Sequence, residues 1–418
     1  MAQAYGSKLN PYRKLREPFG VKGIRQSVVV TNNPSTIDQN QVLTVKFPNL
    51  GPDDVIVPGT ARLGFNIEIE STDDDATIVE NLGRAIVKQI KISLEGQQIF
   101  LLDNADVFKC YADLWLSENT RKDSVYQGIQ SANVAKLRIN AGNKDATKLS
   151  DVAVASAFHN RFCIPLDFDL LTSHLPFCQS ALGDRLSYEL TFNNYADVIR
   201  STDTTAIYKI TGISLEFDMV TNSDLARLIK MQYDSKLPIY YDRVVRHSII
   251  PKDKSDTIWN INLNTPARSL KGILMIFEQP YNAYERQSEM FYNPKIKNVT
   301  VTIEGRPNQI YSMGLQPYHQ YEECCKLFGG TQMSKDFHLF GVRINEYFHD
   351  KYALWLDMRS TDDMHLHGSG RVIENGADGI NFQILKESET KGPLKIYLYL
   401  IYDAQLNISA SRLMSVLY

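Results

Sequence analysis

This 418-residue sequence lacks the segments that direct a protein into or across a membrane. A membrane-spanning helix needs about 20 consecutive apolar residues, and the longest apolar runs here are short, such as residues 272–277 and 396–402. The N-terminus has no charged segment followed by an apolar one, so no signal peptide is expected. The sequence therefore predicts a protein that is not secreted and has no membrane span.

Cysteine is also scarce. The number is odd, the spacing is wide and no C-x-x-C pair occurs, which argues against both a disulfide framework and a zinc site. We expect buried, reduced thiols at the five positions Cys110, Cys163, Cys178, Cys324 and Cys325.

The motifs of common enzyme and cofactor sites are missing as well. There is no P-loop, no G-x-G-x-x-G after a strand, no G-x-S-x-G and no H-E-x-x-H. The net charge of −3 gives no overall attraction to nucleic acid or acidic membranes. Acidic pairs such as Glu68 with Glu70 fall in alternating contexts, which solvated strand faces explain better than a glycosidase site. No catalytic residue and no cofactor is predicted.

One short segment offers candidate metal ligands. Two histidines in an H-x-H pattern on an extended chain point the same way, and a carboxylate lies just before them, in Asp363, His365 and His367. A polar surface loop between strands, ending at Gly368, explains the same residues without a metal. The loop is the preferred interpretation.

What the sequence does contain is a repeat. The segment V-K-Q-I-K-I-S-L-E-G at residues 87–96 returns as I-K-N-V-T-V-T-I-E-G at residues 296–305, half a chain length later. Both copies alternate apolar and polar residues, as a half-buried strand does, and both precede an amphipathic helical stretch. Identical residues occur at Lys88, Glu95 and Gly96 and at Lys297, Glu304 and Gly305. Two copies of one β-rich domain are indicated, because chance resemblance between strands would not repeat the helix as well.

The first 25 residues differ from the rest in charge. They hold six basic residues against Glu17 alone, among them Lys8, Arg13, Lys14 and Arg16. With glycine, serine and proline present and no apolar period, they indicate a flexible basic arm. It is either a solvated tail without a partner or an arm that reaches a neighbouring subunit or an acidic interior.

Strand patterns dominate the remaining chain. We expect helices over residues 106–117, 222–236 and 318–328, and a large surface loop over residues 118–151. Half-buried antiparallel strands must pack as a sandwich or barrel. The predicted fold is all-β with a few inserted helices: two tandem eight-stranded antiparallel jelly rolls. Its predicted parts are an arm at 1–23, a first jelly roll at 24–221, a linker helix at 222–236 and a second jelly roll at 237–418.

Four stretches together resemble a known family. They are residues 81–100, residues 293–311, the tyrosine-bearing helix after each, and L-D-M-R-S-T-D-D-M-H-L-H-G-S-G at residues 356–370. From residue 24 to residue 418 the chain resembles the double jelly-roll major capsid proteins. It is most similar to the shorter ones of Polinton (Maverick) elements and adintoviruses, in the adenovirus-related lineage of double-stranded DNA viruses.

The resemblance implies assembly and not catalysis. It implies homotrimeric, pseudo-hexameric capsomers that tile an icosahedral shell around double-stranded DNA, with penton and minor capsid proteins as further partners. The implied location is the virion, after synthesis in the host cytoplasm or nucleus. The basic arm would then lie at the inner face and contact packaged DNA without sequence specificity. Two alternatives stay open: a carbohydrate- or peptide-binding tandem β-sandwich protein, and a tandem jelly-roll glycan hydrolase.

Overall fold

The computed structural model describes most of the chain. The described residues are 24–31, 34–94, 96–139, 149–167, 186–234, 239–253, 255–279, 287–308, 311, 313–328, 341–359, 370–374, 379–390, 392–409 and 412–417.

These residues form two compact units. The first unit comprises Met1–Asp106, Ser124–Tyr241 and Ala404–Leu417, and the second comprises Val107–Asp123, Asp242–Asp403 and Tyr418. Residues 107–123 therefore come from the first half of the sequence but fold with the second unit. The predicted division at residues 24–221, 222–236 and 237–418 stays a prediction.

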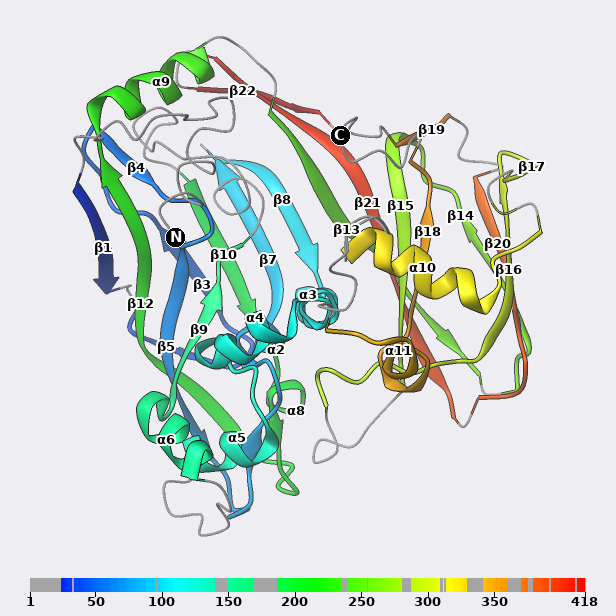
Figure 1. Cartoon of the computed structure of the whole chain (residues 1–418), viewed down its shortest axis with the longest axis horizontal. Coiled ribbons are helices and arrows are strands. Elements are labelled where there is room, and N and C mark those ends of the chain that lie inside the picture. Colours follow the sequence, from blue (N-terminus) through cyan, green and yellow to red (C-terminus); the bar gives the residue numbers. More distant parts are fainter. Residues whose placement is uncertain are drawn as a thin grey trace. The chain divides into compact units, whose positions relative to one another are not determined.

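The first unit is built on two large antiparallel sheets (Figure 1). One sheet has the order β1-β12-β5-β9 and also holds β2 and β4, which pair with β12. Its strands are β1 (Ile24–Thr31), β2 (Thr36–Asp38), β4 (Asp54–Ile56), β5 (Arg62–Glu70), β9 (Arg161–Pro165) and β12 (Ile207–Thr221). The other has the order β3-β10-β7-β8, with β3 (Val42–Lys46), β7 (Val87–Leu94), β8 (Gln97–Asp103) and β10 (Leu186–Phe192). A small sheet pairs β6 (Thr77–Ile78) with β11 (Ile199–Arg200).

The second unit repeats this plan. One sheet has the order β13-β21-β15-β18, with β19 paired to β15 and β22 paired to β21. Its strands are β13 (Ile239–Lys252), β15 (Ala267–Glu278), β18 (Ala353–Asp357), β19 (Arg371–Ile373), β21 (Leu394–Ser409) and β22 (Arg412–Leu417), and the pairing of β21 with β22 falls in the first unit. The other sheet has the order β14-β20-β16-β17, with β14 (Ile258–Leu263), β16 (Ile296–Ile303), β17 (Arg306–Pro307) and β20 (Ile380–Lys386).

The two sets of eight strands have the same order in space and in sequence. Counted along the chain, the first, eighth, third and sixth strands of each set form one sheet, and the second, seventh, fourth and fifth form the other. Thus β1-β12-β5-β9 corresponds to β13-β21-β15-β18, and β3-β10-β7-β8 to β14-β20-β16-β17. This order is that of a jelly roll. The predicted fold class, two tandem antiparallel jelly rolls with inserted helices, is confirmed.

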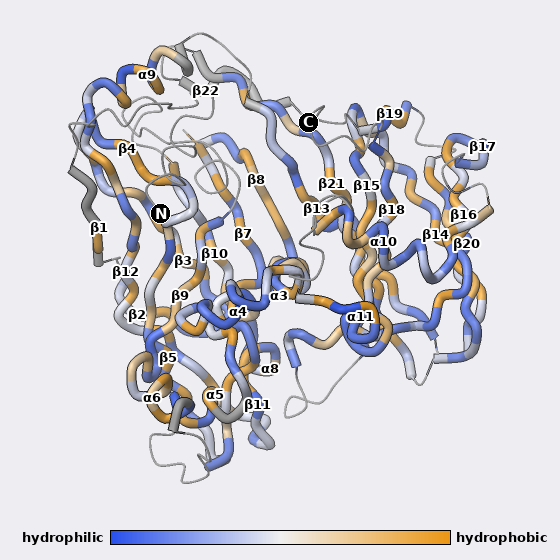
Figure 2. Tube along the Cα trace, in the orientation of Figure 1, coloured by the Kyte–Doolittle hydropathy of each residue, from blue (hydrophilic) through white to orange (hydrophobic). Residues whose placement is uncertain are grey.

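Alternating side chains form the core between the sheets of each unit. Figure 2 shows apolar residues interspersed with polar ones along the strands. In the first unit the Phe47 ring lies 5.4 Å from that of Phe217 on the facing sheet. In the second unit Trp259 on β14 stacks on Phe277 of β15, with ring centroids 6.3 Å apart. These inward positions are nearly inaccessible to solvent, so the period-2 pattern fixes which face of each strand is buried.

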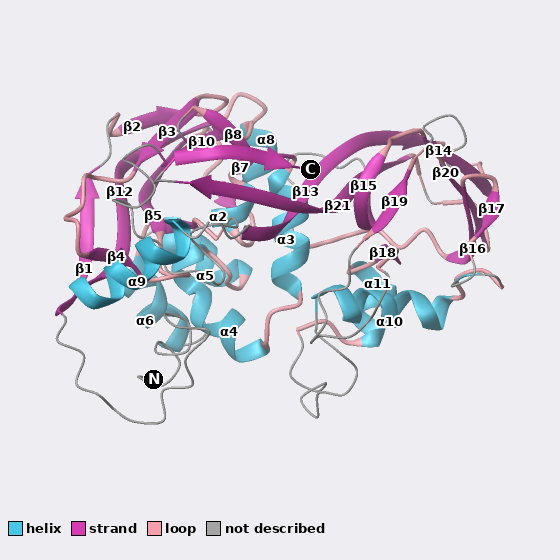
Figure 3. Ribbon diagram, turned by 90° about the horizontal axis from the view of Figure 1, so that it is seen from above, coloured by secondary structure: helices cyan, strands magenta, loops and turns pink. Residues whose placement is uncertain are grey.

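Helices occupy the connections between strands. The first unit holds α2 (Leu82–Ala85), the 3-10 turn η1 (Ser124–Gln127), α5 (Ala132–Ile139), α6 (Leu149–Phe158), α8 (Tyr195–Val198) and α9 (Ser223–Asp234). The helix α3 (Ala105–Leu114) begins in the first unit and continues in the second, which also holds α4 (Glu118–Asp123), α10 (Pro317–Phe328) and α11 (Ile344–Asp350). Figure 3 shows α10 and α11 beside one another near β18. The part of the chain that the structure describes has no helix long and apolar enough to cross a membrane.

The prediction of a surface loop over residues 118–151 is wrong for the described part of this range, because α4, η1 and α5 lie in it and α6 begins in it. Residues 140–148 lie outside the described residues. One charged residue of the predicted loop is buried and paired inside the protein. Arg138, which is fully buried, donates hydrogen bonds to the carbonyl oxygens of His159 and Val125 at 2.7 and 2.8 Å. Its guanidinium also lies over the Phe162 ring at 3.6 Å. A single arginine thus ties α5 to η1 and β9, and composition alone does not show this.

Candidate functional site

The repeated motif forms a β-hairpin in each unit. Strand β7 pairs with β8 so that Leu94 faces Gln97, and β16 pairs with β17 so that Ile303 faces Arg306. Each turn therefore has two residues. Gly96 and Gly305 have φ angles of 82° and 75°, in the left-handed region that glycine adopts without steric cost.

The other residues of the motif have structural positions too. Lys88 and Lys297 are exposed on the outer strand surface. Glu304 also has a positive φ, of 52°, and its carboxylate accepts a hydrogen bond from the Glu374 backbone N–H at 2.8 Å. Glu95 lies outside the described residues. In its described residues the motif is thus a turn that closes a hairpin.

Two loops of the first unit are joined by reciprocal hydrogen bonds to their aspartates. The S-T-D sequences at residues 71–73 and 201–203 lie where β5 ends and before β12 begins. Asp203 Oδ2 accepts hydrogen bonds from the Thr72 backbone N–H at 2.7 Å and hydroxyl at 2.9 Å. Asp73 Oδ2 accepts the reciprocal pair from Thr202 at 2.7 and 3.0 Å. We call this arrangement the reciprocal clasp.

Hydrogen bonds from the clasp and from Thr205 lower the pKa of the two aspartates. For Asp73 the largest cause is the hydrogen bond from the Thr202 backbone, and for Asp203 it is the hydrogen bond from the Thr205 side chain, followed by that from the Thr72 backbone. Hydrogen bonds to the ionised form favour that form. Both carboxylates are therefore ionised at neutral pH and serve as acceptors that hold the loops together.

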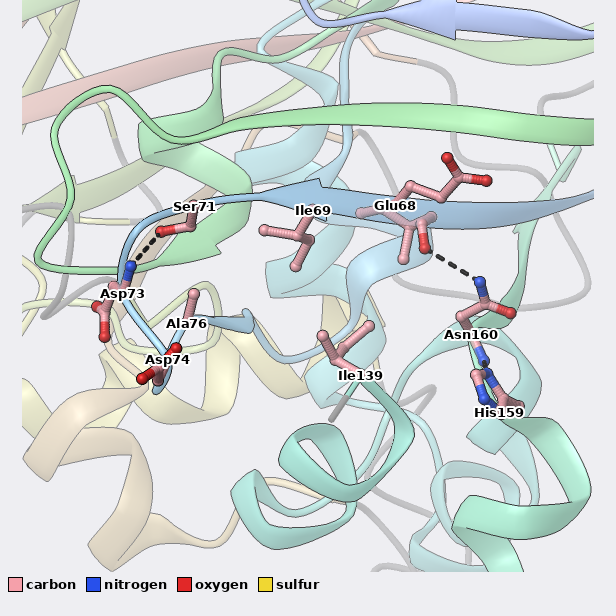
Figure 4. Close-up of a pocket in the computed structure, with 10 residues that line it drawn as sticks. Glu68, Ile69, Ser71, Asp73, Asp74, Ala76, Ile139, His159 and Asn160 are labelled. Carbon is pink, nitrogen blue, oxygen red and sulfur yellow. Dashed lines mark hydrogen bonds between the residues drawn. The ribbon is translucent and has the colours of Figure 1, made fainter. Parts of the chain in front are cut away.

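A pocket of about 400 Å³ lies beside the clasp (Figure 4). Figure 4 shows Asp73 and Asp74 at one end, His159 and Asn160 at the other, and Ile139 of α5 between them. Its other lining residues are Ile67, Glu68, Ile69, Ser71 and Ala76.

Polar groups that line this pocket make hydrogen bonds to neighbouring loops and to the backbone. Glu68 accepts a hydrogen bond from the Thr211 hydroxyl at 3.1 Å, and Asp73 is held in the clasp. The His159 Nδ1 atom accepts a hydrogen bond from the Asn160 backbone N–H at 2.7 Å. Catalysis by a nucleophile and a base requires the two side chains within hydrogen-bond reach of each other, and no contact of that kind joins the residues that line this pocket.

An aromatic cluster joins helices in the second unit. The Tyr111 ring of α3 meets Phe291 edge to face at 5.1 Å, and Trp115 stacks on Phe328 of α10 at 5.9 Å. Trp115 also lies 6.4 Å from Tyr347 of α11. Residues 107–123 are thereby fixed to α10 and α11, and the ion pair of Arg121 with Glu289 at 2.7 Å adds to the attachment.

The cysteines that the structure describes are free and buried, as the sequence predicted. Burial raises the pKa of Cys163 and of Cys324 to about 12, and that of Cys325 to about 11. At neutral pH these thiols are protonated and therefore poor nucleophiles. Cys178 lies outside the described residues.

Two groups of predicted functional residues also lie outside the described residues. One is the basic arm with Lys8, Arg13, Lys14 and Arg16, and the other is the candidate metal site of Asp363, His365 and His367. Among the residues that are described, no group of three or more His, Cys, Asp or Glu side chains is arranged to hold a metal ion.

Sequence reasoning missed the reciprocal clasp and the attachment of residues 107–123 to the second unit. The clasp could have been found in the sequence, because the tripeptide S-T-D occurs in both of its loops. The attachment of residues 107–123 could not, because Trp115 has the same helical spacing as any core residue.

The sequence matches no protein-family profile and no curated protein. Solved structures of viral capsid proteins nevertheless have a similar fold over almost the whole chain. PBCV-1 VP54, fitted into a reconstruction of the virophage Sputnik, has a TM-score of 0.61 at 11% identity, covering 97% of this chain and 99% of that one. The Faustovirus major capsid protein has a TM-score of 0.61 at 8% identity, covering 95% and 92%. The mavirus major capsid protein has a TM-score of 0.53 at 13% identity, covering 98% and 93%.

Proposed function

We propose that this chain is a major capsid protein of a double-stranded DNA virus or virus-like element. One observation carries the proposal. Two jelly rolls of identical strand order stand in one chain, and the likeness to the Faustovirus and mavirus major capsid proteins extends over more than nine-tenths of every chain compared. A structural match to a single β-sandwich binding module would cover only one jelly roll, whereas the matches to the capsid proteins cover both.

The finer parts of the proposal concern assembly. Three copies form a pseudo-hexameric capsomer, and capsomers tile an icosahedral shell with penton and minor capsid proteins. The virus group is that of Polinton elements and adintoviruses, and the protein resides in the virion. A closed trimer would cover strand edges that a single chain leaves unpaired.

The native mass of the purified chain tests the capsomer. One chain weighs 47.5 kDa, and we expect light scattering to find a species of three times that mass that persists on dilution. Electron microscopy should then show hexagonal outlines. A protein that stays monomeric at every concentration, and that forms no shells with its virus's other capsid proteins, would contradict the proposal.

The basic arm is proposed to contact packaged DNA at the inner face of the shell. Deletion of residues 1–23 should leave trimers intact and reduce DNA retention. A matched variant replaces Lys8, Arg13, Lys14 and Arg16 by glutamine, which removes the charge and keeps the length. Binding that depends on phosphate neutralisation weakens steeply as salt rises. Unchanged packaging in both variants would exclude this role.

A further inference from the structure

A buried carboxyl group lies where α10 packs against β18 in the second unit. Glu323 of α10 is only 8% exposed, and Tyr311, which precedes the helix, is 5% exposed. The Tyr311 hydroxyl donates a hydrogen bond to Glu323 Oε2 at 3.3 Å. It accepts another from the backbone N–H of Asp357, the last residue of β18, at 2.9 Å. We call Tyr311, Glu323 and Asp357 the carboxyl bridge, because the hydroxyl joins the helix to the strand.

Charges of both signs surround Glu323. Lys326, three residues along α10, donates a hydrogen bond to Glu323 Oε1 at 2.8 Å. The Asp357 carboxylate is held by Arg359, whose Nε lies 3.0 Å from both Asp357 oxygens. Burial has the largest effect on the Glu323 pKa and raises it, and the Asp357 charge acts in the same direction. Lys326 and Tyr311 oppose this effect without cancelling it.

Other elements that pack on α10 meet it at different positions. The Tyr347 hydroxyl of α11 lies 3.6 Å from the Cys324 sulfur, and the Ile296 carbonyl of β16 accepts a hydrogen bond from Gln320 at 3.4 Å. In the described part of the second unit, the titratable groups that act most strongly on Glu323 are therefore Lys326, Asp357 and Tyr311.

Protonation of Glu323 changes the hydrogen bonds that Tyr311 can make. The Tyr311 oxygen lies 3.3 Å from Glu323 Oε2 and 3.4 Å from the Asp357 carbonyl oxygen, and its one hydrogen can serve only one of these acceptors. The ionised carboxylate is the stronger acceptor and takes it. Once Oε2 has bound a proton from solvent, the carboxyl group donates to the Tyr311 oxygen, and the tyrosine hydrogen turns to the Asp357 carbonyl. The neutral form thus joins α10 to β18 by one hydrogen bond more.

We propose that Glu323 is a proton-binding switch, which takes up a proton in mildly acidic solution and then holds α10 more firmly on β18. The folded chain keeps this proton at pH values where the unfolded chain, with a pKa of about 4.3, has released it. The added stability is therefore fully present below the unfolded pKa and is lost as pH rises through the folded-state pKa. All residues of the carboxyl bridge belong to the second unit of one chain, so the switch does not require assembly.

The reciprocal clasp of the first unit responds to acid in the opposite direction. Hydrogen bonds lower the pKa of Asp73 and of Asp203, so the clasp loses stability only as pH falls below the unfolded value of about 3.9. Between neutral pH and about pH 4, acidification should strengthen the second unit without loosening the clasp.

Denaturant unfolding followed by tryptophan fluorescence measures the switch, because all three tryptophans belong to the second unit. Glu323→Gln cannot titrate, and Glu322→Gln is the matched control at the adjacent, exposed glutamate of α10. From pH 7.5 to pH 4.5 we expect the unfolding equilibrium constant of the wild type to fall about twofold or more relative to that of Glu323→Gln. Glu322→Gln should behave like the wild type. A ratio between wild type and Glu323→Gln that does not change with pH would overturn the proposal.

Infrared spectroscopy detects the bound proton itself. A protonated carboxyl group has a C=O stretching band that a carboxylate lacks, and the spectrum at pH 4.5 should contain such a band in the wild type that is missing from Glu323→Gln. Tyr311→Phe removes the acceptor of the carboxyl proton and should shift this band. The wild-type band and its shift test the switch even if Glu323→Gln folds poorly. A band that is absent at pH 4.5, or that Tyr311→Phe leaves unshifted, would contradict the proposal.

Discussion

Replacing Trp115 by alanine should destabilise the second unit although Trp115 belongs to the first half of the sequence. Its side chain is only 3% exposed. Its ring lies 5.9 Å from Phe328, 6.1 Å from Tyr321 and 6.4 Å from Tyr347. Truncation of a buried tryptophan to alanine costs about 3–5 kcal/mol, through lost burial and the cavity that remains. For a unit of this size that corresponds to a fall in the unfolding midpoint of about 6–20 °C.

The tryptophan content of the chain supplies the assay. The three tryptophans, Trp115, Trp259 and Trp355, all belong to the second unit. Tryptophan fluorescence therefore follows the unfolding of this unit, and two reporters remain in the variant. Far-UV circular dichroism reports the unfolding of both units. An unfolding transition that is seen by circular dichroism and not by fluorescence therefore belongs to the first unit.

Two further variants make the test specific. Trp115→Phe keeps an aromatic ring and should cost less than half as much. Lys122→Ala alters an exposed residue of the adjacent α4, whose side chain is 68% exposed, and should change stability by less than about 0.5 kcal/mol. If Trp115→Ala moved the tryptophan transition no more than Lys122→Ala does, residues 107–123 would not be an integral part of the second unit, and the reasoning would be refuted.

Three other changes have expected outcomes. Asp203→Asn should weaken the reciprocal clasp at neutral pH and should make the stability of the first unit less sensitive to acid. The Asp203 pKa is lower in the folded protein than its value near 3.9 in the unfolded chain, so the ionised carboxylate stabilises the fold above that pH, and this stability is lost as pH falls through the folded-state pKa. A variant whose melting profile between pH 5 and pH 2 matches the wild type would exclude this role. Gly305→Ala should cost about 1–2 kcal/mol, because nothing lies within 4 Å of the added methyl group and the positive φ is the only obstacle; Gly305→Asn should cost less by denaturant unfolding, and equal losses would contradict the conformational explanation. Lys386→Met should stabilise the second unit by about 1 kcal/mol or more, because the buried ammonium has no hydrogen-bond partner among the described residues. It lies 4.5 Å from the Trp259 ring and is attracted by the charges of Asp256 and Glu389 without a hydrogen bond to either. Burial lowers the Lys386 pKa, so wild-type stability should rise with pH from the native pKa up to the unfolded value near 10.4, and the variant should lose this slope; a destabilised Lys386→Met would show that the cation–ring contact prevails.

Local patterns predicted the elements of the fold well. The alternation at residues 87–94 and 296–303 identified strands β7 and β16, and the E-G pairs marked the turns that follow. The helix expected at residues 318–328 is α10, one residue longer at its start. These features depend on contacts within a few residues, which the sequence records directly.

Contacts between segments far apart in the chain were harder to predict from the sequence. The segment at residues 118–151 has the composition of a loop, yet Arg138 is buried and satisfied by carbonyl groups from three places in the chain. The candidate site was hard to predict for the same reason. The acidic run at residues 73–75 is visible in the sequence, but its partner loop at residues 201–205 becomes evident only when β5 and β12 lie side by side.

The sequence by itself determined the strands, their buried faces, the hairpin turns and the duplication of one domain, because the period of apolar residues and the glycines at positive φ are local requirements. Only the tertiary structure decided which strands are neighbours, that Trp115 and the helix before it complete the second unit, and that the loops at residues 71–73 and 201–203 pair through their aspartates. Those outcomes arise from burial and hydrogen bonding between residues tens to hundreds of positions apart, and no local pattern encodes which of many compatible segments will meet.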